Sequence, residues 1–253
     1  MKTIMYLVLL IPLMVISQAP KEYNVIENAM LTANPEKIQE FESGMAAHNK
    51  KYHAQGIYGA RVYWIANGKN AGKYVWVMGP LPWSALDTRP AQEGHDMDWN
   101  TNVLPYMLPE TEQHYWRFHP ELSNFSKDFT IKNLLIFVVD VKRFKHMEFM
   151  EVVKKVQKVY LEKMPDHPYG IYINDMANME GMDFAWVDFF EKSAWMGNRD
   201  SFPLHFEEVY GSGSFKNFLK EIEDTTNGES EELWIYKEAL SGLGAKVLAA
   251  SRQ

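Results

Sequence analysis

The sequence predicts an α+β protein built from two tandem β-α-β-β-α-β units. Of the 253 residues, 46% are hydrophobic and 14% are aromatic, which is enough apolar material for a large packed core. Strand-like and helix-like hydrophobic patterns follow one another in the same order in both halves. An aromatic-X-Trp-Val pattern also occurs twice, at 74–77 and at 184–187, so that Trp76 and Trp186 lie 110 positions apart.

The first half begins with a predicted strand at 24–32, followed by a helix at 34–55. Asn34 is a suitable N-cap and Pro35 suits the first helical position, while apolar residues recur on one face of the segment. Residues 58–65 and 74–78 are rich in β-branched and aromatic residues and flank a Gly/Asn turn, which indicates a hairpin. A short helix at about 97–104 and a fourth strand at 113–118 complete the unit.

The second half has the same order of elements. The predicted elements are a strand at 129–139, a helix at 141–164, hairpin strands at 169–173 and 182–189, an amphipathic helix at 212–224 and a last strand at 232–236. Trp116 and Trp234 mark the two closing strands and lie 118 positions apart, and the eight extra residues fit the variable region before the last strand. The repeat indicates an internal duplication, with units at 20–124 and 125–253.

Residues 1–19 form a separate segment. Lys2 precedes an apolar run at 4–16, and small residues follow at Ser17 and Ala19, which is typical of a signal peptide cleaved near Ser17 to Ala19. A membrane anchor is the alternative, but the run is about 13 residues and a spanning helix needs roughly 20. We therefore expect a secreted or periplasmic protein with no membrane span in its mature form.

Composition excludes several function classes. The absence of cysteine excludes disulfides, thiolate metal sites and thiol catalysis. The net charge of −7 and the lack of a basic tract argue against nucleic-acid binding. The chain also lacks GxSxG, GxxxxGK[ST], HExxH and a GxGxxG motif after a strand.

A β-α-β-β-α-β order is the ferredoxin-like arrangement, and two copies over about 22–242 resemble the tandem form of the dimeric α/β-barrel superfamily. The chain is similar in this respect to NIPSNAP, EthD and antibiotic-biosynthesis monooxygenase proteins. The resemblance implies two antiparallel sheets packed as a barrel within one chain, with a pocket between the sheet and the helices of each unit. It further implies cofactor-free oxygenation or haem-linked chemistry. We expect a monomer with an internal pseudo-dimer, or a homo-oligomer.

Aromatic residues on the hairpin strands are the candidate ligand-binding residues. Tyr63, Tyr74, Trp76 and Trp186 could line a pocket for a flat ligand such as haem; the alternative is that they fill the core. Asn28 in the first strand is a further candidate, because some monooxygenase relatives carry an asparagine at such a position.

Two histidines are the candidate catalytic residues. His48 lies on the apolar stripe of the first predicted helix, where it could be a haem ligand, a general base or a core histidine with satisfied hydrogen bonds. His53 is expected to point elsewhere. It lies five positions after His48, whereas a helical metal pair needs a spacing of four.

His95 lies in a polar stretch with Asp96 and Asp98. These side chains could hold a divalent ion or act as an acid/base pair, or Asp96 could simply cap the short helix. We assign no metal site. The sequence thus predicts an exported protein that binds a small, largely apolar or aromatic ligand, with cofactor-free monooxygenase or haem-linked activity. The alternative is a non-catalytic envelope binding or interaction protein with no active site.

Overall fold

The first unit contains a four-stranded antiparallel sheet with the order β4-β1-β3-β2. The computed structural model describes residues 22–89 and 93–249, so the expected signal peptide lies outside the described residues. The elements of this unit are β1 (Asn24–Leu31), α1 (Ile38–Tyr52), β2 (Ala60–Ile65), β3 (Tyr74–Pro82), η1 (Trp83–Thr88), α2 (His95–Asn102), η2 (Leu104–Tyr106) and β4 (Glu112–Phe118).

Helix α1 is shorter than predicted at both ends. The Asn34 side chain accepts a hydrogen bond from the backbone N–H of Glu36 (3.0 Å), which forms a local turn, and the helix begins at Ile38. It ends at Tyr52, so His53 is the first residue beyond it. The backbone therefore leaves the helical conformation at His53.

The second unit repeats this topology, with the sheet order β9-β6-β8-β7. Helix α4 was not predicted, although Phe202, Phe206 and Tyr210 recur at the four-residue spacing of one helix face. The last strand begins earlier than predicted, directly after α5. The elements are β6 (Asn133–Val141), α3 (His146–Lys163), β7 (Tyr169–Asn174), β8 (Phe184–Phe190), η3 (Ser193–Ser201), α4 (Phe202–Tyr210), α5 (Ser214–Thr225), β9 (Thr226–Tyr236) and η4 (Glu238–Leu240).

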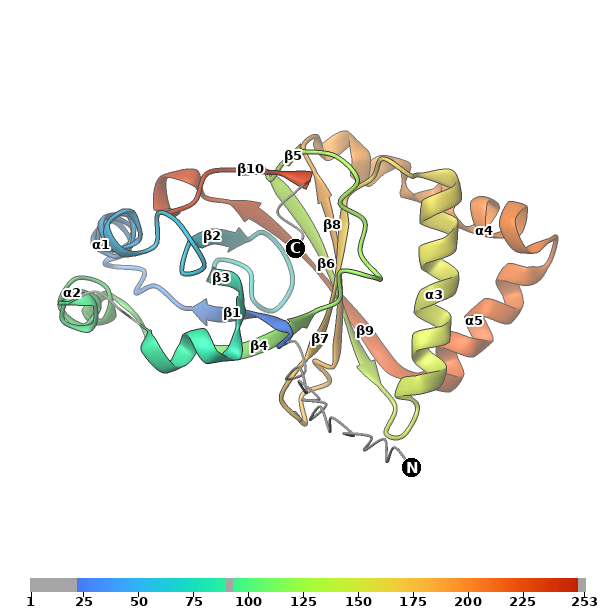
Figure 1. Ribbon diagram of the computed structural model, residues 1–253, viewed down its shortest axis with the longest axis horizontal. Coiled ribbons are helices and arrows are strands. Elements are labelled where there is room, and N and C mark those ends of the chain that lie inside the picture. Colours follow the sequence, from blue (N-terminus) through green and yellow to red (C-terminus); the bar gives the residue numbers. More distant parts are fainter. Residues whose placement is uncertain (1–21, 90–92, 250–253) are drawn as a thin grey trace, which may run out of the picture.

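The two sheets join into one closed barrel of eight strands, in the order β1-β3-β2-β9-β6-β8-β7-β4. Strand β2 pairs with β9 and β4 pairs with β7, so each strand of the barrel has two neighbours. Helices α1 and α2 lie outside the barrel against the first unit, and α3, α4 and α5 lie on the opposite side (Figure 1). The predicted α+β fold of two ferredoxin-like units is confirmed.

The repeated tryptophans occupy equivalent positions in the two units. Trp76 in β3 lies opposite Ala29 of β1, and Trp186 in β8 lies opposite Phe137 of β6. The closing strands match in the same register, with Trp116 opposite Ile26 and Trp234 opposite Leu134.

Strand alternation divides the side chains between the barrel interior and the helix-covered outer face. In β2, Val62 faces the helices, whereas Tyr63 faces the interior. A short sheet of β5 (Phe129–Thr130) and β10 (Lys246–Val247) lies beside the barrel. Within residues 22–89 and 93–249, no helix is long and apolar enough to cross a membrane.

Candidate functional site

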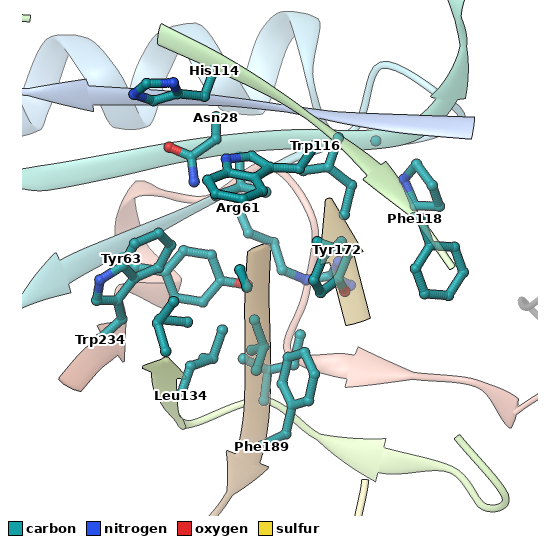
Figure 2. Close-up of a pocket in the computed structure, with 18 of the residues that line it drawn as sticks. Asn28, Arg61, Tyr63, His114, Trp116, Phe118, Leu134, Tyr172, Phe189 and Trp234 are labelled. Carbon is teal, nitrogen blue, oxygen red and sulfur yellow. The ribbon is translucent and has the colours of Figure 1, made fainter. Parts of the chain in front are cut away.

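A cavity of about 680 Å³ lies inside the barrel, between its two sheets. Both units supply its walls. Its lining is largely aromatic and aliphatic, and residues of β5 and β10 also contribute to it. The lining residues labelled in Figure 2 are Asn28, Arg61, Tyr63, His114, Trp116, Phe118, Leu134, Tyr172, Phe189 and Trp234.

Arg61 is one of several polar residues in the lining, which also includes Glu112, His114, Glu180 and Glu232. Figure 2 shows Arg61 extending into the cavity near Tyr63 and Tyr172. Its Nε–H donates to the carbonyl of Gly244 (3.0 Å), and no carboxylate in the described part of the chain forms an ion pair with it. Burial raises the pKa of the Tyr63 and Tyr172 hydroxyls, although Arg61 acts in the opposite direction. Both phenols therefore stay neutral near pH 7, and Arg61 supplies a positive charge between them.

The cavity lies on the opposite face of the sheet from the expected pocket. Asn28 and Tyr63 line this cavity, whereas Tyr74, Trp76 and Trp186 lie on the outer face, packed beneath the helices. The expectation of a ligand pocket between sheet and helices lined by these three residues is thus corrected. The physical reason is the two-residue period of a strand, which sends Tyr74 and Trp76 outward and Val75 and Val77 inward.

The outward aromatics have hydrogen-bond partners within the sheet–helix layer. The Tyr74 hydroxyl donates to Glu42 (2.7 Å), and the Trp76 indole N–H donates to the Asn49 side chain (2.9 Å). The Trp186 indole N–H donates to Asp188 (3.1 Å). These contacts fit the alternative in which the aromatic residues build the core.

A second polar site lies between the first sheet and its helices. His48 and His95, the two predicted catalytic residues, meet there with His53, which the sequence did not place in a site. His53 and His48 are almost fully buried, and the His53 and His95 Nε2 atoms are 3.0 Å apart. The expectation that His53 points elsewhere is therefore wrong. Because His53 follows the last residue of α1, its side chain is not restricted to the helical spacing.

Burial dominates the electrostatics of this cluster. It lowers the pKa of His48, against the opposing effect of the Asp98 carboxylate. It lowers the pKa of His53 to about 4, despite a hydrogen bond to the backbone. Both rings are accordingly neutral at pH 7.

Haem is the cofactor that the resemblance implies for His48 or His95. A haem iron takes axial ligands on the two opposite faces of the macrocycle. Here one ring nitrogen from each of His48, His53 and His95 lies within 4.8 Å of the others, which leaves no space for a macrocycle between them. No two of these histidines can therefore bind one haem iron from opposite faces.

Solved structures of known proteins share this fold. A candidate monooxygenase from Lactobacillus acidophilus is 13% identical, with a TM-score of 0.56 over 85% of this chain and 94% of that one. One from Fusobacterium nucleatum is 11% identical, with a TM-score of 0.57 over 85% and 93%. A candidate chlorite dismutase is 8% identical, with a TM-score of 0.51 over 85% and 96%. These likenesses establish the fold, which is that of a dimeric α/β barrel formed within one chain. No protein-family model and no curated protein sequence matches the chain.

Sequence reasoning missed Arg61 and His53. Arg61 is the one charged residue in the otherwise apolar or aromatic strand β2, ARVYWI, and that contrast could have marked an inward polar group. No local pattern could have marked His53, because its site forms only when α2 packs against α1.

Proposed function

We propose that the protein binds a small, largely apolar or aromatic molecule that carries an anionic group, inside the barrel cavity. The observation that supports this most directly is the cavity itself, whose volume of about 680 Å³ falls within the range of ligand sites. Its lining is mostly apolar and aromatic and includes a smaller number of polar side chains, which is the usual composition of such sites.

Arg61 supports the anionic character of the ligand. A guanidinium group offers several N–H donors in one plane and suits carboxylates and similar anions. The Arg61 Nε–H is used by Gly244, and the other donors belong to the terminal nitrogens. Tyr63 and Tyr172 bring neutral hydroxyls near the same charge (Figure 2). An anionic group would be held there, with the apolar part of the molecule against the barrel walls.

Two dyes of nearly the same shape test this proposal. 8-Anilinonaphthalene-1-sulfonate carries a sulfonate, whereas N-phenyl-1-naphthylamine is uncharged. We expect both to bind in fluorescence titrations. Arg61→Leu is expected to weaken binding of the sulfonate dye roughly 10- to 100-fold, since a hydrogen bond to a charged group contributes about 1.5–3 kcal/mol, and to leave the uncharged dye unaffected.

Two further variants complete the test. Arg143→Leu removes an exposed arginine, so it should bind both dyes as the wild-type protein does. Ala185→Trp places a large ring at an inward position that lines the cavity. Val187→Trp does so at the next inward position of β8. Unchanged binding of both dyes in a folded tryptophan variant would contradict the proposed location. An equal loss of both dyes in Arg61→Leu would contradict the role of the charge.

Cofactor-free oxygenation stays a prediction from the resemblance, because the cavity observations concern binding alone. A non-catalytic carrier of the same ligand is the alternative.

We further propose that the protein acts outside the cytoplasm, on the basis of the apolar segment at 4–16 and the small residues after it. Mass spectrometry of the protein purified after expression in an exporting host should find an N-terminus near Gln18. Recovery of the intact chain beginning at Met1 would contradict this.

A further inference from the structure

The histidine cluster brings three imidazole nitrogens to one point from three different places in the chain. His48 lies in α1, His53 directly follows that helix, and His95 begins α2. Their ligand atoms lie within 4.8 Å of one another, and the Nε2 atoms of His53 and His95 are 3.0 Å apart.

The second nitrogen of each ring fixes where its proton lies. His53 Nδ1 lies 2.7 Å from the backbone carbonyl of Tyr58, which can only accept a hydrogen bond. His48 Nδ1 lies 2.8 Å from Asp98 Oδ2, and His95 Nδ1 lies 3.0 Å from Asp96 Oδ1. When a ring carries a single proton, that proton therefore lies on Nδ1.

It follows that each Nε2 presents a lone pair to the shared point. Two lone pairs 3.0 Å apart repel each other, so the contact between His53 and His95 is unfavourable when nothing lies between them. The buried His48 Nε2 has no hydrogen-bond partner among the residues that the structure describes. A cation at this point would be bound by all three atoms.

We propose that His48, His53 and His95 bind one divalent transition-metal ion through their Nε2 atoms. Zn²⁺ is the first candidate, because imidazole is one of its usual ligands and this chain has no thiolate. Zinc–nitrogen distances of about 2.0–2.1 Å in tetrahedral geometry place the nitrogens roughly 3.3 Å apart, which small side-chain adjustments reach from the present arrangement. Three protein ligands leave a fourth position for water or a substrate, as in catalytic rather than structural zinc sites.

The surroundings support a metal site as much as the ligands do. A carboxylate or a backbone carbonyl bound to the other ring nitrogen is the usual second layer around metal-bound histidine. Aromatic rings hold the imidazoles in place, with centroid distances of 5.2 Å from His48 to Trp99 and 5.0 Å from His53 to Trp76. Asp96 and Asp98 serve as these partners, whereas direct binding of an ion by the two carboxylates was one of the alternatives that the sequence left open.

The second unit has no counterpart of this cluster among its described residues. The space between its sheet and helices is filled by an apolar cluster that includes Phe149, Phe184, Phe206 and Phe218. The metal site would therefore be a property of one unit only.

Direct metal binding tests the proposal without any assay of activity. Protein stripped with a chelator is titrated with Zn²⁺ in competition with a chromophoric chelator, and Co²⁺ is used to record the d–d spectrum. We expect one equivalent of metal per chain and the absorption of a low-symmetry Co²⁺–nitrogen site. His95→Ala is expected to weaken binding more than about 100-fold, and Asp98→Asn roughly 10- to 100-fold.

His205→Ala is the matched control, because His205 lies on α4 in the other unit and should leave metal affinity unchanged. If His48→Ala does not fold, the more exposed His95 still supplies a ligand variant. Stoichiometric binding that survives His95→Ala would overturn the proposal. Failure of the wild-type protein to bind one equivalent of Zn²⁺ or Co²⁺ would overturn it as well.

Discussion

Trp186→Ala is expected to lower the free energy of unfolding by about 3–5 kcal/mol, the usual cost of removing a large buried aromatic side chain. Trp186 is buried and stacks on Tyr169, with ring centroids 4.4 Å apart. Its indole N–H also donates to Asp188, a carboxylate that is almost fully buried. The alanine variant would leave a cavity, and the Asp188 carboxylate would lose one hydrogen-bond donor. Urea unfolding followed by fluorescence of the remaining tryptophans measures the change.

Two related variants separate the causes. Trp186→Phe keeps most of the ring and loses the N–H, so it should cost less than the alanine variant. Trp76→Ala, at the equivalent position of the first unit, should cost a similar free energy and also weaken metal binding, because Trp76 packs on His53. A loss below about 1 kcal/mol for Trp186→Ala would show that the aromatic side chains beneath the helices contribute little to the free energy of unfolding.

Gly44→Ala is expected to destabilise the protein by about 1–3 kcal/mol, despite the better helix propensity of alanine. A Cβ at Gly44 would lie 1.8 Å from the backbone oxygen of Asn102, at the end of α2. Helices α1 and α2 would have to separate, and α2 carries His95 and Asp98. The variant should therefore lose metal affinity as well as stability, which thermal unfolding with and without Zn²⁺ measures.

Gly228→Ala is the control for this prediction, since its Cβ would meet nothing within 4 Å. A Gly44→Ala protein with wild-type stability and wild-type metal affinity would show that α2 can shift without cost. The position of His95 would then not depend on the close approach of the two helices.

The order of elements could be predicted because strand and helix patterns are local. The Trp76/Trp186 repeat marked the register, and the paired strands match it in both units. Helix α4 was not predicted, although its aromatic residues recur every four positions. It lies in the variable region before the last strand, in a segment where no helix was expected.

The two sites depend on longer-range geometry. The way in which the two sheets close around each other decides which face of β3 lines the cavity. Trp76 was therefore predicted to contact a ligand, whereas it packs beneath the helices on the outer face. The meeting of His53 with His95 depends on the end of α1 and on the packing of α2. Neither follows from the spacing of residues in the chain.

The seams of the barrel have a consequence for assembly. They are formed by β2 with β9 and by β4 with β7, so each joins one unit to the other. If the two units were separate chains, the barrel and its cavity would form only above the dissociation constant of the dimer. Joining them in one chain replaces that equilibrium by an intramolecular one with a high effective concentration. Occupancy of the cavity should then depend on the concentration of ligand alone, even when the protein is very dilute.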